Sequence, residues 1–364
     1  MRTLLSLRSN RKILSEENFD SEFVIATGGS LKYFKDSDGK EYVLHVFYTS
    51  GFFTLNATKT CDILLVGGGG SGGPGYGNMD TGKGGGGAGG VQFRQNYSLS
   101  AGEYEIGVGR GGHPPLHDRG YNGEDNFRFN MSSRGGSTTW QDVSETTGNG
   151  GVIANGGGGG GGGDNDYAPQ KGGSGGGAGA RSSSYTVGAI SELASFSGWT
   201  KYGNAGGNSN GGGNYGGGGG GGATGAGGNH GSSGNLGTTA NAGDGGYGGT
   251  GINMSGIFGI EVGDDGWFAG GGAGGTYYHA AWSTDRKVSL GGKGGGGNGV
   301  WGREQSNFDY NNMTADNKSF KIDGMDGTGG GGGGSSEGNE SQSMHGAQCG
   351  LGGSGIAIVR YEIT

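Results

Sequence analysis

Proline and cysteine are both scarce in this sequence, with four prolines and two cysteines among 364 residues. A collagen-like triple helix needs abundant proline and glycine at every third position, and the unbroken glycine run 156–163 violates that period. Two cysteines, Cys61 and Cys349, are too few for the disulfide scaffold of a chain of this length. The two thiols can either pair with each other or stay free.

Charged residues and long hydrophobic runs are also few. Charged residues make up 15% of the chain and the formal net charge is −8, which disfavours the phosphate backbone of nucleic acids. In the first fifteen residues, basic side chains interrupt the apolar ones before a secretory hydrophobic region forms. Nor is there an apolar stretch long enough to cross a bilayer. We therefore expect neither a nucleic-acid partner nor membrane insertion.

Glycine is what the chain has in abundance, with 103 residues, whereas hydrophobic residues make up 29%. Glycine loses more backbone entropy on folding than any other residue, so such a chain must stay disordered or gain order from a dense backbone hydrogen-bond network. Segments without Cβ atoms can form extended left-handed threefold helices that pack very closely and bond to their neighbours through N–H and C=O groups. The satisfied backbone would then replace a hydrophobic core.

Ordinary β-strand patterns lie at both ends of the chain. Short β-branched and aromatic runs occur between Ser30 and Val66, with a turn at 36–39, and the chain closes on a strand at 355–364. We expect strands within 42–66 to pair with this closing strand, and segments 90–100 and 102–109 to form a hairpin. These patterns predict a β framework over 28–66, 90–112 and 355–364, preceded by an attachment arm or disordered tail at 1–27.

The remaining residues, 67–89 and 113–354, are predicted to form a bundle of polyglycine helices with connecting loops. The glycine tracts show no fixed repeat period, which argues against a solenoid of identical units. They occupy 67–90, 156–179, 203–228, 243–251, 269–275, 291–299 and 327–334.

Two motifs that could carry chemistry are weak. Residues 77–83 nearly match a phosphate-binding loop, but Gly84 stands where Ser or Thr would hold magnesium, and the glycines that follow cannot supply the receiving helix. His113, His117 and Asp118 lack further metal ligands at a recognisable spacing, so a plain surface loop is the better interpretation. No catalytic constellation can be argued from the sequence. We expect a protein that is not an enzyme and has no metal or cofactor.

Several of these segments together resemble a known family, the glycine-rich domain of bacteriophage tail-fibre tips and of structural proteins of large algal viruses. The resemblance covers about residues 27–364 and rests on an ordered series of motifs, at 61–73, 82–112, 267–275, 290–300, 324–334 and 350–361. A similar module in some animal receptor ectodomains has a jelly-roll-like sandwich that carries a glycine-helix insert. The resemblance thus implies a small antiparallel β-sandwich framework with a large inserted polyglycine II bundle, in a fold that is otherwise irregular or β.

Segments between the tracts are the candidates for recognition. Loops that join parallel rods gather at the rod ends, and aromatic rings with polar tips bind sugars or protein surfaces at low entropic cost. The same rings could instead cap the ends of the bundle or pack on a neighbouring copy. The receptor-binding candidates are Trp199, Tyr202, Tyr277, Tyr278, Trp282, Trp301 and Tyr310.

The resemblance implies a virion surface protein that binds a host through these loops. In this hypothesis the arm and framework dock onto a fibre or capsid protein, and the loops contact a host surface glycan or envelope protein. By analogy with fibre proteins, the framework is also a candidate for trimer formation. The alternative is a structural subunit of a capsid, fibre or extracellular filament with no receptor role. A disordered glycine-rich protein is disfavoured, because the strand patterns would then serve no purpose.

Overall fold

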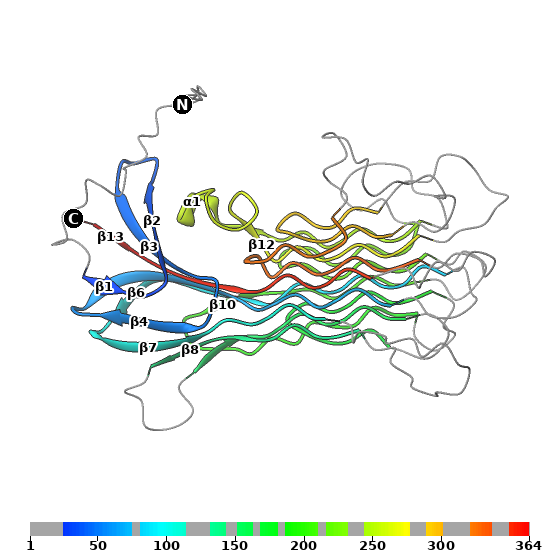
Figure 1. The fold of residues 1–364 in the computed structure, drawn as a ribbon, viewed down its shortest axis with the longest axis horizontal. Coiled ribbons are helices and arrows are strands. Elements are labelled where there is room, and N and C mark those ends of the chain that lie inside the picture. The colour runs from blue at the N-terminus through cyan, green and yellow to red at the C-terminus, as the bar shows by residue number, and fades with distance from the viewer. Residues whose placement is uncertain are drawn as a thin grey trace, which may run out of the picture.

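The protein is mostly β, with several antiparallel sheets and almost no helix (Figure 1). It is described here from a computed structural model. The structure describes residues 25–74, 81–113, 132–142, 151–162, 168–180, 186–209, 216–231, 244–276, 289–300, 321–336 and 349–363.

One antiparallel sheet has five strands in the order β1-β4-β7-β8-β9. Their bounds are Ala26–Thr27, Gly51–Leu55, Gly102–Gly107, Thr138–Asp142 and Val152–Ala154.

The second antiparallel sheet has six strands in the order β10-β6-β5-β13-β3-β2. The closing strand β13 lies between β3 and β5, which confirms the expected pairing of the C-terminal strand. The predicted turn at 36–39 joins β2 to β3, where the Asp36 carboxylate accepts the backbone N–H groups of Asp38 and Lys40. The strand bounds are Thr200–Tyr202, Val91–Leu99, Lys59–Val66, Ile356–Glu362, Glu41–Phe47 and Ser30–Lys35.

A buried cluster draws residues from both sheets. The rings of Phe53, Tyr104 and Trp140 come from the five-stranded sheet, with centroids 4.9–6.3 Å apart. Opposite them, β5 contributes Ile63 and Leu65, and β13 contributes Val359. Successive side chains of a strand point to opposite faces, so Leu64 and Ile358 face away from this cluster. They are nonetheless fully buried, which explains why residues 63–66 of β5 and 356–359 of β13 are all apolar.

Residues 252–268 cover the other face of the six-stranded sheet and form a second core with it. This segment contains β11 (Ile252–Asn253), the one-turn helix α1 (Ser255–Phe258) and β12 (Trp267–Phe268), which pairs with β11. Arg360 on β13 anchors it: the guanidinium bonds Asp62 at 2.7 Å, donates to the Ile257 carbonyl and lies over the Tyr42 ring. The sequence analysis did not anticipate this layer.

The predicted hairpin of 90–100 and 102–109 is wrong. Strand β6 pairs with β5 and β10, whereas β7 pairs with β4 and β8, so the chain crosses from one sheet to the other between Leu99 and Gly102. The Tyr104 hydroxyl donates to the Ser100 carbonyl at 3.0 Å and holds this corner. The alternating pattern of a strand is the same whichever strand it pairs with, so nearness in sequence gave the wrong partner.

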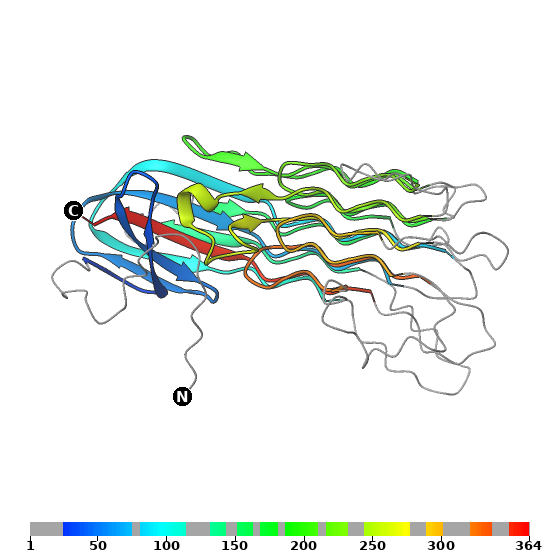
Figure 2. The ribbon, with the colours of Figure 1, turned by 90° about the horizontal axis from the view of Figure 1, so that it is seen from above.

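Glycine-rich segments extend from one end of the sheets and run side by side (Figures 1 and 2). We call each straight segment a rod. Many reverse direction at turns near the framework, such as the turns at 173, 223–225, 293–295 and 326–328. The rods are 67–74, 81–90, 109–113, 132–137, 155–162, 168–173, 174–180, 186–192, 203–209, 216–223, 225–231, 244–251, 269–276, 289–293, 296–300, 321–325, 329–336 and 349–355.

Hydrogen bonding between rods has a period of three residues. In rod 67–74 the N–H groups of residues 67, 70 and 73 donate to rod 81–90, those of residues 68 and 71 to rod 132–137, and those of residues 69 and 72 to rod 349–355. Successive N–H groups therefore point in three directions around the rod axis. A β-strand, whose period is two, cannot bond in this way.

Rod 81–90 lies at the centre of the bundle. Its N–H groups donate to rods 155–162, 216–223 and 329–336, and its carbonyls accept from rods 67–74, 174–180 and 269–276, at N···O distances of 2.7–3.0 Å. Both hydrogen-bonding groups of nearly every residue in this rod are thus satisfied by neighbouring rods, as burial requires.

Close approach of the rods explains why these positions are glycine. A Cβ atom added at Gly86 would lie 2.1 Å from the Gly70 carbonyl oxygen, and one added at Gly69 would lie 2.0 Å from that of Gly330. Ordinary contacts begin near 3.4 Å. A methyl group at either of these two positions would therefore force the rods apart and strain their hydrogen bonds.

Strands and rods alternate within the ranges predicted as separate domains. Rods occupy much of 67–89 and 113–354, but β8, β9 and β10 also lie in the second range and join the two sheets. Residues 109–112, placed in the framework from the sequence, belong to a rod. Within the predicted arm 1–27, Ala26 and Thr27 form β1, and residues 1–24 lie outside the described part. The short strands between glycine tracts were not predicted, because a strand of a few residues shows no clear periodicity.

Candidate binding surface at the far end of the rods

The rods place one set of described chain ends opposite the sheets. From Val66 the chain follows rod 67–74 away from the framework and returns along rod 81–90 to β6. The same out-and-back path recurs along the bundle, so described residues such as Gly73, Lys83, Ser209, Thr276 and Ser336 lie together at the far end (Figure 2). We call this end of the bundle the far end.

Buried hydroxyl groups terminate several rods there. The Ser335 hydroxyl donates to the Gly73 carbonyl at 2.9 Å, and that of Ser336 to the Thr276 carbonyl at 2.7 Å. Ser209 and Ser289 donate in the same way to carbonyls of adjacent rods. Here side-chain hydroxyls add donors to those of the backbone; the Gly73 carbonyl, for example, also accepts the Ser335 N–H at 3.2 Å. The hydroxyl layer gives the far end a fixed base.

Lys83 is the charged residue at the end of the central rod. Its side chain is 1% exposed, and its ammonium donates to the Thr81 hydroxyl at 2.5 Å. A phosphate-binding lysine needs its ammonium directed toward an open loop. The near-match at 77–83 therefore places its lysine inside the bundle, and residues 77–80 of the motif lie outside the described part.

The histidine loop considered as a metal site is described only at its start. His113 ends the rod 109–113, while His117 and Asp118 lie outside the described residues. Among the described residues there is no group of three or more His, Cys, Asp or Glu side chains arranged to hold a metal ion. In the same part of the chain, no helix is long and apolar enough to cross a membrane.

Both cysteines are buried and free, which settles the open alternative in favour of unpaired thiols. Burial raises the pKa of Cys61 and of Cys349 to about 12. At neutral pH both therefore stay protonated, and a protonated thiol is a poor nucleophile.

His45 is the buried histidine of the framework. Its Nδ1 lies 2.7 Å from the Gly28 carbonyl and its Nε2 lies 3.4 Å from the Tyr361 hydroxyl, so the neutral ring with the proton on Nδ1 fits both partners. Burial lowers the pKa of His45, against a smaller opposing effect of the Gly28 hydrogen bond. The ring thus ties the β1–β2 corner to the closing strand as an uncharged group.

Two of the seven aromatic candidates lie in the described part of the chain. Trp199 is partly buried against the core between the two sheets, and Tyr202 on β10 packs against the second core. Both are on the framework and not at the far end, where the sequence analysis placed them. Tyr277, Tyr278, Trp282, Trp301 and Tyr310 lie outside the described residues.

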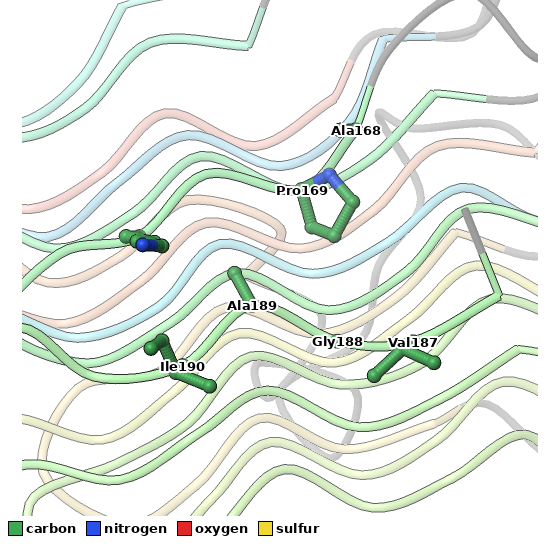
Figure 3. Close-up of a pocket in the computed structure, with 7 residues that line it drawn as sticks. Ala168, Pro169, Val187, Gly188, Ala189 and Ile190 are labelled. Carbon is green, nitrogen blue, oxygen red and sulfur yellow. The ribbon is translucent and has the colours of Figure 1, made fainter. Parts of the chain in front are cut away.

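A shallow depression of about 330 Å³ lies on the flank of the bundle between rods 168–173 and 186–192 (Figure 3). Val187 and Ile190 beside it are 67% and 58% exposed, unusually high for aliphatic side chains. We call it the side depression. Its sequence signal is two apolar residues three positions apart with a glycine between them, a pattern that is not specific for a binding surface. Its lining residues are Ala168, Pro169, Lys171, Val187, Gly188, Ala189 and Ile190.

Comparison with known proteins supplies no relative on which to base a function. No family model matches the sequence, and no curated protein matches it significantly. The functional argument therefore rests on the chain's own residues and on the arrangement of framework, rods and far end.

Proposed function

We propose that this protein is a virion surface adhesin, in which a jelly-roll-like β-sandwich carries a rigid bundle of polyglycine II helices with receptor-binding loops at its far end. Two ordered sheets around a shared core support the sandwich. The glycine-rich family resemblance supplies the viral setting.

Three features support the polyglycine II conformation of the rods. Hydrogen-bond partners repeat every third residue, and the central rod exchanges bonds with rods on all sides. Positive φ values among the described glycines occur at turns and rod ends, such as Gly294, Gly295, Gly327 and Gly329, and not within the rods. A threefold helix with negative φ is left-handed and rises about 3.1 Å per residue, so rod 67–74 would be about 25 Å long.

The observation that carries the functional proposal is the polarity of the molecule. The framework, with the end of the N-terminal arm in β1, lies at one end, and the described outer ends of the rods lie at the other. This arrangement suits a spacer that presents the segments between rods away from an attachment point. The arm and framework would dock onto a virion fibre or capsid protein, and the far end would contact a host surface glycan or envelope protein.

Adhesion also fits the chemistry of the described residues. Surface recognition needs complementarity and no reactive group, and the two described thiols are buried and protonated. In this proposal the protein is not an enzyme, requires no cofactor, and acts on the virion surface outside cells, alone or as a trimer.

A second candidate function is that of a structural subunit of a capsid, fibre or filament with no receptor role. The side depression favours it, because exposed aliphatic residues on the flank of a rod bundle suit lateral contact with another virion component better than contact at the tip.

Replacing candidate aromatic residues, with exposed framework aromatics as a control, tests the adhesin proposal. One variant of the full chain changes Tyr277, Tyr278 and Trp282 to serine, and a matched control changes the framework residues Tyr48 and Phe52, which are 43% and 51% exposed. Binding of each purified protein to an array of immobilised glycans and to host membrane proteins is compared with that of the unchanged chain.

We expect the first variant to lose binding and the control to keep it. Equal loss in both variants, or no binding by the unchanged chain, would contradict the adhesin role. Immunogold labelling of intact particles then separates the two functions, because far ends buried between virion components support the structural subunit.

A further inference from the structure

The two rods beside the side depression share one inner neighbour. The Gly176 N–H donates to the Gln170 carbonyl at 3.0 Å, and the Ala189 N–H donates to the Gly176 carbonyl at 2.9 Å. Rods 168–173 and 186–192 are thus both bonded to rod 174–180, and they are also bonded to each other, because the Glu192 N–H donates to the Gly172 carbonyl at 2.6 Å. The depression lies along the groove between these two adjacent rods (Figure 3). In a lattice where each rod is surrounded by others, this is the position of one further rod.

Rod 186–192 directs part of its hydrogen-bonding capacity outward. The Gly188 N–H donates to the Asn208 side chain and the Ala189 N–H to rod 174–180. Among the described residues, no acceptor bonds the N–H groups of Val187 and Ile190, whose side chains are the exposed pair. The threefold hydrogen-bond pattern of the bundle therefore continues to its surface, where the N–H groups of Val187 and Ile190 lie one helical turn, or about 9 Å, apart along the rod.

The size of the depression selects the kind of occupant. A stable contact between two protein copies buries about 800 Å² on each and involves roughly 20–30 residues a side. The side depression has seven lining residues and about 330 Å³. That space fits about one turn of a single extended chain, and is far too small to hold a second copy.

We propose that the side depression binds a proline-rich segment of another protein in the left-handed threefold conformation. Proline holds this conformation before binding, so little entropy is lost, and its rings match the aliphatic walls. Its carbonyls, spaced three residues apart, accept the Val187 and Ile190 N–H groups. Proline has no N–H of its own that would be left unpaired. Lys171, exposed on the opposite rim, favours an acidic residue next to the prolines.

This inference does not depend on the receptor-binding role of the far end. It adds a second binding surface, on the flank of the bundle. The binding mode is analogous to β-strand addition, in which an extended peptide pairs with the exposed hydrogen-bonding edge of a sheet; here the edge belongs to a threefold rod. The handedness of the rods makes the proposal specific, because a right-handed threefold peptide of the same composition cannot follow the same groove.

The test uses the full chain and a fluorescein-labelled decaproline that carries one terminal aspartate. Fluorescence anisotropy compares the L-peptide with its all-D mirror image, which forms a threefold helix of the opposite hand. Ile190→Asp places a charge in the depression, and Val187→Asp is the second variant in case the first does not fold. Ile260→Asp is the matched control, since Ile260 is 50% exposed on the segment that covers the six-stranded sheet.

We expect saturable binding of the L-peptide, no binding of the D-peptide, and at least about tenfold weaker binding in the depression variants, because a desolvated charge opposes an apolar contact. The control should bind as the unchanged chain does. Binding of both peptides alike, or equal weakening by Ile260→Asp, would overturn the proposal. Self-association in sedimentation that Ile190→Asp abolishes, without peptide binding, would instead assign the depression to contact between copies.

Discussion

Replacing Gly86 by alanine should destabilise the protein, although the same change usually stabilises a protein where the backbone allows it. Gly86 has no positive φ, so its backbone conformation is open to alanine. Reduced freedom of the unfolded chain would then contribute about 0.4–1 kcal/mol of stability. Packing opposes this gain, because the new Cβ would lie 2.1 Å from the Gly70 carbonyl oxygen and 2.7 Å from that of Ser71.

The expected cost follows from how far the rods must move. To reach an ordinary contact near 3.4 Å, rods 67–74 and 81–90 must separate by more than an ångström, which stretches the bonds from Gly70 to Gly87 and from Gly73 to Gly84. Overpacking of a tight interior costs about 1–3 kcal/mol, and each weakened buried hydrogen bond about 1 kcal/mol. After subtraction of the gain from the unfolded chain, we expect a net loss of about 2–4.5 kcal/mol, which corresponds to a fall in Tm of about 3–9 °C.

Gly256→Ala is the matched control, measured by calorimetry and by urea denaturation beside Gly86→Ala. Gly256 lies in α1 with no atom within 4 Å of an added Cβ, so alanine should be neutral or stabilise by up to about 1 kcal/mol. Opposite signs for the two variants would support backbone packing as the basis of stability. If Gly86→Ala were neutral or stabilising, the close approach of the rods would not contribute to stability as argued.

Three further predictions concern buried ionisable groups. Arg360→Leu should lower the free energy of unfolding by about 3–5 kcal/mol in urea denaturation, because it leaves the Asp62 carboxylate buried without its partner. Adding Asp62→Leu should recover part of that loss. Strictly additive losses in the double variant would contradict the pairing. Burial lowers the pKa of His45, so the contribution of its neutral ring to stability is complete above about pH 6.5, the pKa in the unfolded chain, and declines as the pH falls below that value. The fall in Tm between pH 7 and pH 5 should therefore be smaller in His45→Gln than in the unchanged protein. An equal fall in both proteins would show that His45 is not its cause. With a pKa of about 12, Cys61 and Cys349 should react with a thiol reagent at pH 8 only after unfolding, so rapid labelling of the native protein would show that the thiols are accessible.

The framework strands were predictable because each carries a local signal. Asp36 and Gly39 predict the turn between β2 and β3, and the apolar run of β13 indicates a strand buried on both faces. The pairing of strands was harder to predict than their positions. Strands β6 and β7 have the same alternation of side chains that a hairpin would have, and only the packing of the two sheets around Tyr104 and Trp140 places them in different sheets. Three-residue strands such as β10 have no pattern at all.

Backbone order in the glycine-rich region was predictable, but the arrangement of the rods was not. Glycine content demands backbone order, but a tract of identical residues does not state which neighbours it will bond. The far-end hydroxyl layer and the side depression depend on that arrangement. Ser335 and Ile190 have ordinary sequence contexts, and their roles emerge only when rods distant in sequence lie beside them. Trp199 shows the opposite limit, since an aromatic residue between tracts proved to lie on the framework.

The threefold hydrogen-bond pattern leaves the glycine rods with an alignment problem. A rod that slipped along its axis by three residues would offer every neighbour the same donors and acceptors, so its own backbone cannot tell the correct position from the shifted one. The few side chains at the turns therefore act as stops: Asp264 accepts the N–H groups of Gly294 and Gly295, and Asp326 that of Ser354. The expected misfolded state of such a chain is therefore a bundle in which one rod has shifted along its axis by one turn, and not a chain that has lost the bundle.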